Sequence, residues 1–350
     1  MKNNLKKLRT LIGHIDTVIV KSISSVKILS PVYYLFKPNF WREQWGVISG
    51  RAKYYENIQN KKGNEFHLRR NIHRIEKGIL MKPRKDVFAE SYIMNTVENY
   101  LQLKEKNYYE STLKWAKDVL VNYFEVTDEK KSRILSDAKN KFYSYTDTDI
   151  ESEQNENFVP YIRDVRSFPK ISIEDLEGLA KYRRSVRWFL DKKIDFDIID
   201  KSIDVASQSP SACNRLPYQY KVFQNKEDII KIAGSAMGTS GYLNNIPNLI
   251  AIVGDLSAYP HERDRHLIYI DSSLSAMSFL YSLEVQGVSS CVINWPDIEK
   301  REKRISKHLN LKPYEKVTML IAFGYADPNG MVAYSKKKDL KTMRNYERLQ

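Results

Sequence analysis

The chain has 350 residues, enough for two ordinary domains that each bury a hydrophobic core. Hydrophobic residues account for 42% and charged residues for 29%, and 13 glycines and 12 prolines are too few for an extensively disordered chain. The formal net charge of +14 creates a positive potential that attracts nucleic acid, anionic lipid or phosphorylated ligands, without selecting among them.

Cysteine usage and hydropathy bear on the location of the protein. Cys213 and Cys291 are too few for a disulfide framework, and no Cys/His spacing typical of zinc is present. Basic residues before an apolar N-terminal stretch resemble a signal peptide, but Asp16 and Lys21 interrupt that stretch and no cleavage site follows it. No run of about 18 apolar residues predicts a spanning helix. We therefore expect a soluble, cytoplasmic protein without a metal ion.

Residues 1–60 are basic and aromatic, and residues 28–36 carry almost no charge before Phe40 and Trp41. Basic residues that flank apolar and aromatic ones suit an anionic membrane surface. The alternative is that these side chains pack on their own domain. The sequence leaves both interpretations open.

Helical periodicity continues through the first half of the chain. Apolar residues at spacings of three and four predict an amphipathic helix over 68–79 and another over 113–120. Residues 145–157 then shift to Asp, Thr, Glu, Ser and Asn, a composition typical of a linker. We predict a mainly α-helical N-terminal domain at 1–157 and a second domain at 158–350.

The second half alternates helices with short apolar strands, which predicts an α+β fold. The expected helices are 174–182, 195–207, a long one at 265–286 that ends before Gly287, and 298–309 with Asp297 as its N-cap; the expected strands are 220–223, 249–253, 288–294 and 317–323.

Two segments near the start of this domain are candidates for binding. Arg183, Arg184 and Arg187 crowd around Ser185, and guanidinium and hydroxyl groups suit a phosphate, although most arginine clusters are solvated faces. The second segment is the loop 209–214, where small residues let the backbone approach a ligand.

Two further segments follow strands. Asn294 and Trp295 come after the predicted strand 288–294, where an aromatic side chain can lie against a flat ring. The run from Lys336 to Lys338 follows the last strand and either returns to a phosphate or belongs to a solvated tail.

Taken in order, these segments resemble the nitroreductase family of FMN enzymes over about residues 172–340. The matching parts are Arg-Arg-Ser-x-Arg at 183–187, Ser-Pro-Ser-Ala-x-Asn at 209–214, the long helix, and the strand Leu-Ile-Ala-Phe-Gly-Tyr at 320–325. The resemblance implies a central sheet flanked by helices, an intertwined homodimer, and FMN sites at the dimer interface.

The resemblance also implies roles for single residues. Arg183 and Ser185, with Arg184 alongside, are expected to hold the FMN phosphate, and Arg187 is expected near the pyrimidine edge of the flavin. The other implied contacts are Pro210, Ser211, Ala212 and Asn214 from the partner subunit, Asn294 and Trp295 at one ring face, and Lys336 or Lys338 at the phosphate. No residue is assigned a catalytic acid, base or nucleophile.

Two segments of the chain depart from the family pattern. Leu216-Pro217-Tyr218 stands where the family often has Gln-Pro-Trp, and Tyr242 to Asn245 match no family polar segment convincingly. The motif at 68–78 resembles the extension of long nitroreductase-like proteins from bacterial surface-polysaccharide gene clusters, which suggests a tailoring step on a sugar.

Two hypotheses follow. The first is an enzyme in which FMN takes a hydride from NADH or NADPH and passes electrons to a small organic acceptor. The second is a flavin-fold scaffold protein that makes peripheral membrane contact through its N-terminal segment or joins a biosynthetic complex. Nucleic-acid binding is disfavoured because no recognition module is present.

Overall fold

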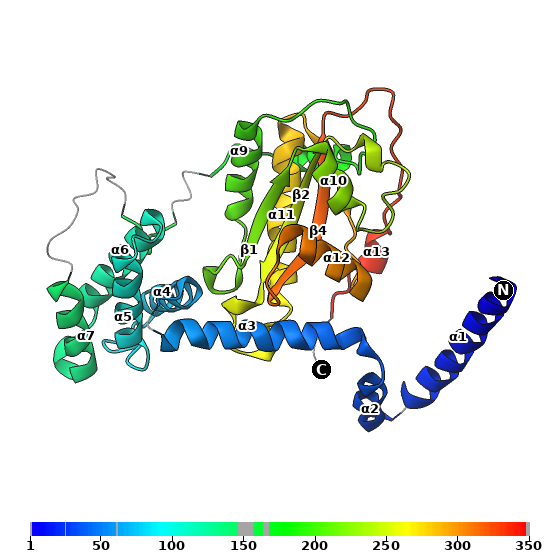
Figure 1. Ribbon diagram of the computed structural model, residues 1–350. Coiled ribbons are helices and arrows are strands. Elements are labelled where there is room, and N and C mark those ends of the chain that lie inside the picture. Colours follow the sequence, from blue (N-terminus) through cyan, green and yellow to red (C-terminus); the bar gives the residue numbers. More distant parts are fainter. Residues whose placement is uncertain (1, 25, 61, 146–156, 164–167, 348–350) are drawn as a thin grey trace.

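The computed structural model describes residues 2–24, 26–60, 62–145, 157–163 and 168–347 (Figure 1). Most of the predicted linker at 145–157 lies outside these ranges, so the domain boundary stays a prediction.

A four-stranded antiparallel sheet forms the centre of the C-terminal half. Its strands are β1 (Tyr218–Phe223), β2 (Asn248–Asp255), β3 (Ser289–Ile293) and β4 (Glu315–Gly324), in the order β1-β2-β4-β3. The central strands β2 and β4 are largely buried, which explains why each is an apolar run without alternation. The α+β prediction is confirmed.

Helices cover both faces of this sheet. The helices of this half are α8 (Ile173–Tyr182), α9 (Phe196–Ser207), α10 (Lys226–Ala233), α11 (Leu267–Val285), α12 (Glu299–Leu309) and α13 (Leu340–Met343). Ile250, Ile252 and Phe323 pack with α9 and α11 on one face, whereas Leu249 and Ala251 pack with α10 and α12 on the other. Successive strand residues thus serve opposite cores.

The predicted helix ends mostly agree with these bounds. The helix expected at 265–286 is α11, and Gly287 follows it with φ +75°, a left-handed conformation that glycine adopts without a steric cost. Asp297 as the N-cap of α12 is wrong: Ile298 occupies the N-cap without a side-chain hydrogen bond. Asp297 instead forms an ion pair with Arg42.

A helical region with its own core precedes the sheet. It contains α4 (Glu65–Ile79), α5 (Ile93–Glu105), α6 (Glu110–Val126) and α7 (Arg133–Ser144). Leu68, Ile72 and Ile75 on α4 are fully buried in this core with Leu120 of α6, as the helical periodicity predicts. The mainly helical character of the N-terminal part is confirmed.

Helix α3 (Trp41–Gln59) joins the helical region to the sheet. Figure 1 shows α3 below the sheet in this view. Its Val47 packs with Leu256, Tyr259 and Ile268 in a small core at the end of β2. A Cβ atom at Gly50 would lie 2.7 Å from the backbone of Leu256, so glycine permits this close approach.

Short 3₁₀ helices occur in both halves of the chain. They are η1 (Lys27–Leu29), η2 (Pro38–Phe40), η3 (Glu129–Lys131), η5 (Ala212–Asn214), η6 (Leu243–Asn245), η7 (Leu256–Ala258) and η8 (Glu262–Asp264).

The N-terminal arm, residues 2–40, contains α1 (Lys2–Ser24) and α2 (Ser30–Leu35). Figure 1 shows α1 projecting away from the rest of the chain. Asp16 accepts hydrogen bonds from Lys37 Nζ at 2.7 Å and from Tyr33 Oη at 2.8 Å, which link α1 to α2. None of the described helices is both long and apolar enough to cross a membrane.

Candidate flavin site

The arginine motif 183–187 lies between α8 and the first residues of β3. Ser172 begins α8 with a capping box, in which its hydroxyl accepts from Asp175 N–H at 3.0 Å and its N–H donates to the Asp175 carboxylate at 3.1 Å. Arg183 follows the last residue of this helix. Ser185 forms a parallel bridge with Ser290 of β3, so the motif is fixed to the sheet.

Two hydrogen-bond donors in or beside this motif are buried without a partner in the described part of the chain. Arg183 is half-buried, and its Nε has no hydrogen-bond partner among the described residues. The hydroxyl of buried Ser290 likewise has no partner there. An unpaired buried donor costs about 1–3 kcal/mol, so an acceptor supplied by a ligand would stabilise the motif. This observation fits a phosphate.

Arg187 is exposed beside this cluster. Its Nη1 donates to the Ser185 carbonyl at 3.3 Å, and its guanidinium lies 5.9 Å from the centroid of the Tyr242 ring. Burial raises the pKa of Tyr242 to about 12 and raises the pKa of the nearby Cys291 thiol, a shift that Arg187 opposes. Tyr242 and Cys291 are therefore neutral near pH 7, and Arg187 adds a positive charge to this surface.

The basic C-terminal run lies on the same side of the sheet. Arg184 Nη1 donates to the carbonyl of Tyr334 at 3.3 Å, which brings the segment before Lys336 against the motif. Lys336 and Lys338 are both exposed. A phosphate contact by Lys336 or Lys338 stays a prediction.

The loop 209–214 has a strained backbone. Cys213, Asn214 and the following Leu216 have φ values of 56°, 51° and 49°, in the left-handed region that costs non-glycine residues about 1–3 kcal/mol each. Hydrogen bonds hold this shape: Ala212 N–H donates to Asp271 Oδ2 at 2.9 Å and Leu216 N–H donates to Ser211 Oγ at 2.9 Å. Pro210 is exposed at the start of the loop.

The arginine motif and this loop lie at opposite ends of the sheet. Tyr218, just after the loop, pairs with Gly254 at the carboxyl end of β2. Ser290, beside the motif, pairs with Phe323, which pairs with Asn248 at the amino end of β2. At about 3.3 Å per residue, β2 separates the two ends by roughly 20 Å. A single chain does not bring the two segments together.

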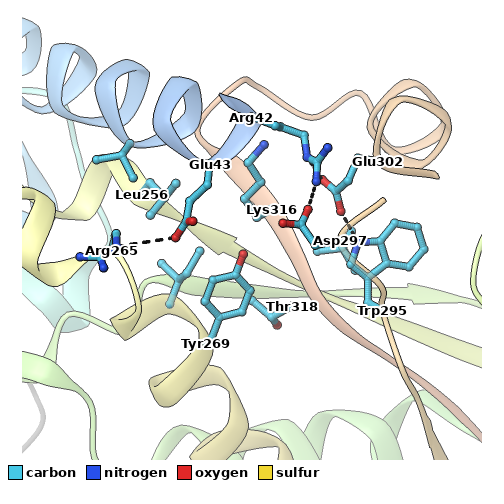
Figure 2. Close-up of a pocket in the computed structure, with 13 residues that line it drawn as sticks. Arg42, Glu43, Leu256, Arg265, Tyr269, Trp295, Asp297, Glu302, Lys316 and Thr318 are labelled. Carbon is cyan, nitrogen blue, oxygen red and sulfur yellow. Dashed lines mark hydrogen bonds and ion pairs between the residues drawn. The ribbon is translucent and has the colours of Figure 1, made fainter. Parts of the chain in front are cut away.

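Trp295 lies in a separate pocket of about 230 Å³. Figure 2 shows its indole ring beside Asp297 and Glu302, and the indole N–H donates to Glu302. Asn294 is exposed beyond the end of β3. The remaining walls come from α3, η7, the end of η8, α11 and β4 and include Arg42, Glu43, Leu256, Arg265, Tyr269, Lys316 and Thr318.

The charges in this pocket largely pair with one another. Arg42 contacts Glu299 at 2.5 Å and Glu302 at 3.6 Å, and Arg265 contacts Glu43 at 3.7 Å. Burial lowers the pKa of Lys316. In the described part of the chain, no group of three His, Cys, Asp or Glu side chains is arranged to hold a metal ion.

The sequence interpretation missed three parts of this site. Tyr242 faces Arg187, and Asn245 fixes the end of the motif by accepting from Phe189 N–H at 2.6 Å and donating to the Phe189 carbonyl at 3.1 Å. The sequence predicts Ser290 only as a strand residue and does not reveal its place beside the arginine motif. The polar and aromatic side chains of residues 242–245 could have marked this segment as part of the site. Their partners in the arginine motif, however, lie more than 50 residues away in sequence.

Comparison with known proteins assigns a family resemblance to the same half of the chain. The Nitroreductase family model matches residues 180–240 and 235–325, which include the arginine motif, the loop and all four strands. These residues make up less than half of the chain, and the helical region lies outside them.

Individual relatives cover a similar stretch. A protein of Archaeoglobus fulgidus named "Putative NADH dehydrogenase/NAD(P)H nitroreductase" is 26% identical over 155 residues, which are 44% of this chain and 86% of the relative. A protein of Methanothermobacter thermautotrophicus with the same name is 24% identical over 160 residues, 46% of this chain and 82% of the relative. The solved structure of an FMN-dependent nitroreductase from Clostridium difficile is 23% identical, with a TM-score of 0.42, and covers 49% of this chain and 99% of that chain.

Proposed function

We propose that the protein is an FMN-dependent oxidoreductase that passes a hydride from NADH or NADPH, through the flavin, to a small organic acceptor in the cytoplasm. The family match and the names of the two relatives indicate an oxidoreductase enzyme. The observation that carries the FMN proposal is the unpaired Nε of Arg183 beside the exposed Arg187.

Each residue of the motif has a distinct task in this proposal. Arg183, Arg184 and Ser185 hold the FMN phosphate, because guanidinium and hydroxyl donors match its oxygens. Arg187 stabilises negative charge at the pyrimidine edge when the flavin is reduced. FMN itself supplies the capacity to accept and release a hydride, so no side chain has to act as a nucleophile.

We further propose that the functional unit is a homodimer. The arginine motif and the loop of one chain lie at opposite ends of β2, which supports a site completed by a second copy. Pro210, Ser211, Ala212 and Asn214 then reach the flavin held by the partner's motif.

The acceptor in this proposal is a small organic molecule. The resemblance of the motif at 68–78 to extensions encoded in surface-polysaccharide gene clusters supports a sugar or a nucleotide-linked sugar. Trp295 and Asn294 belong to the flavin ring face in this proposal. Because Trp295 lies in the pocket of Figure 2, that contact requires the flavin or its substrate to reach this pocket.

The visible absorption spectrum of the purified protein, before and after addition of FMN, tests the cofactor. We expect a bound-flavin spectrum in the wild-type protein and its loss in an Arg183→Ala, Arg187→Ala double variant. NADH and NADPH are then tried as reductants of the bound flavin. A folded wild-type protein that takes up no FMN would refute the proposal.

A second proposal concerns the N-terminal arm, which we propose docks on an anionic membrane surface. Its apolar side chains are widely exposed, including Leu11, Ile12, Ile15, Val18, Ile28, Leu35 and Phe36, of which Phe36 is 82% exposed. Seven Lys and Arg residues and one Asp give residues 1–40 a net charge of +6. The single acid, Asp16, is already paired with Lys37.

The charge balance favours lipid over a second copy as the partner of the arm. Residues 41–350 carry the remaining +8 of the total charge, so a second chain presents a positive surface to a positive arm. Anionic lipid offers the opposite charge and an apolar layer for the exposed side chains.

Sedimentation with vesicles separates these partners. We expect the protein to pellet with vesicles that contain phosphatidylglycerol, less so at high salt, and to stay in the supernatant with phosphatidylcholine. Ile15→Glu with Phe36→Glu should abolish pelleting, whereas Ile134→Glu on α7, also at an exposed apolar position, should not. Arm-dependent self-association in analytical ultracentrifugation, without lipid binding, would assign the arm to a second copy instead.

A further inference from the structure

The motif at 68–78 in the helical region meets the loop 209–214 of the sheet domain. Arg69 on α4 donates a hydrogen bond of 2.7 Å from Nε to the carbonyl oxygen of Asn214. Helix α4 packs on η5, the short helix within that loop. Two segments that the sequence analysis treated separately are therefore in direct contact.

Side chains of α6 fix the guanidinium of Arg69 from the other side. Arg69 Nη1 donates to Thr112 Oγ1 at 3.4 Å, and the guanidinium lies 5.2 Å from the ring centroid of Trp115. Trp115 is itself held, because its Nε1 donates to Glu76 of α4 at 3.0 Å. The hydrogen bond to Asn214 thus comes from a preorganised donor.

The acceptor of this hydrogen bond is in the strained part of the loop. Asn214 and Cys213 both have left-handed backbone angles, which persist only where surrounding contacts over-determine them. Asp271 and Ser211 hold the loop from within the sheet domain. Arg69 adds a hydrogen bond to the loop from the helical region. It binds Asn214, the residue whose side chain is expected to contact the flavin.

We propose that Arg69 is a positioning residue that keeps Asn214 in its flavin-facing conformation, and that the helical region is therefore a working part of the flavin site. The role rests on the proposed function, since the flavin is what Asn214 would contact. The side-chain contacts of Arg69 described above are with the loop and α6, so its proposed effect on the flavin is indirect.

The test compares full-length wild-type protein with Arg69→Ala, Arg69→Lys and Arg70→Ala. Arg70 is the matched control, because it is the next residue on α4 and no hydrogen bond links it to the loop among the described residues. The readouts are the Kd for FMN from quenching of flavin fluorescence, the visible circular dichroism of the bound flavin, and hydrogen exchange at the amides of Asn214 and Leu216.

We expect Arg69→Ala to raise the Kd for FMN about tenfold, since it removes a hydrogen bond from a charged donor. The same variant should alter the visible circular dichroism and speed exchange at the Asn214 and Leu216 amides, while amides of β2 exchange as in the wild type. Arg69→Lys keeps a cationic donor and should recover part of the loss, and Arg70→Ala should behave like the wild type.

Three results would overturn the proposal in distinguishable ways. If the wild type binds no FMN, the proposed function fails and the positioning role fails with it. If the wild type binds FMN and Arg69→Ala has the same Kd, spectrum and loop exchange, only the positioning role fails. Faster exchange throughout β2 in Arg69→Ala, with equal losses in Arg70→Ala, would mean that the helix merely contributes stability.

Discussion

The backbone N–H of Val186 donates a hydrogen bond of 3.0 Å to the carbonyl oxygen of Ser290. Because Val186 is buried and the chain is extended here, its neighbours Ser185 and Arg187 project together to the surface. The hydrogen bond therefore fixes where the charge of Arg187 lies relative to β3, and this charge is open to a direct test.

Replacing Arg187 by Gln should lower the reduction potential of bound FMN. The loss of a fixed positive charge disfavours the anionic reduced flavin, and each tenfold loss of preference for a two-electron reduced form lowers the potential by about 30 mV. Arg187→Lys keeps the positive charge and should give a reduction potential close to that of the wild type. Arg133→Gln, at a position 93% exposed on α7, should leave the potential unchanged. Equal potentials in the wild type and Arg187→Gln would place the flavin away from this residue.

Gly50→Ala tests the docking of α3 on the sheet domain. Its Cβ would lie 2.7 Å from the carbonyl carbon and oxygen of Leu256, atoms of the backbone that cannot move aside easily. We expect the free energy of unfolding to fall by about 1–3 kcal/mol in urea denaturation. Gly178→Ala on α8 is the matched control, because the added Cβ would meet no atom within 4 Å beyond its chain neighbours and the helix's own backbone, and it should be neutral or slightly stabilising. Equal effects of the two substitutions would mean that α3 is not closely packed.

The sequence predicted those parts of the fold that depend on local pattern. Helical spacing identified α4 and its buried Leu68, and continuous apolar runs identified β2 and β4, because both faces of these strands are covered. The first two residues of β1 were missed, since their place in the sheet depends on pairing with Val253 and Gly254.

The errors and omissions come from contacts between distant segments. Asp297 has the side chain of a good N-cap, but Arg42 of α3 competes for its carboxylate, and no local pattern reveals that ion pair. The contact of Arg69 with Asn214 was missed for the same reason. The arginine motif itself was found because its residues are consecutive.

Asp255 should make the protein less stable as the pH rises from about 4 to about 6. Burial raises its pKa to about 6, so in this interval the folded state binds a proton that the unfolded state has released. Asp255→Asn keeps an acceptor for the Ser257 N–H, at 2.7 Å in the wild type, but cannot ionise. We expect this variant to gain about 1–2 kcal/mol relative to the wild type at pH 7, and little at pH 4. Urea denaturation at both pH values measures the difference, and an equal gain at pH 4 and pH 7 would contradict it.

His67 should have the opposite effect on stability. Burial, and then the cations Arg70, Arg215 and Arg74, lower its pKa to about 4. Between about pH 6.5 and pH 4 the unfolded state therefore binds a proton that the folded state does not, so the contribution of His67 is lost as the pH falls through this interval. The difference corresponds to about 3 kcal/mol at most.

The neutral imidazole is also held by hydrogen bonds. Asn71 Nδ2 lies 3.0 Å from His67 Nε2, and Tyr54 Oη lies 2.8 Å from Nδ1. With the Asn71 amide as donor, Nε2 accepts this hydrogen bond and Nδ1 carries the proton. Protonation of Nε2 would place its N–H against the N–H of the Asn71 amide, so the hydrogen bond would be lost. We expect an NMR titration of the imidazole to give a midpoint near pH 4. His67→Gln should flatten the loss of stability between pH 6.5 and pH 4 relative to the wild type, with His308→Gln on α12 as the control. A midpoint near 6.5 would show that water reaches the imidazole and that the arginines nearby are screened.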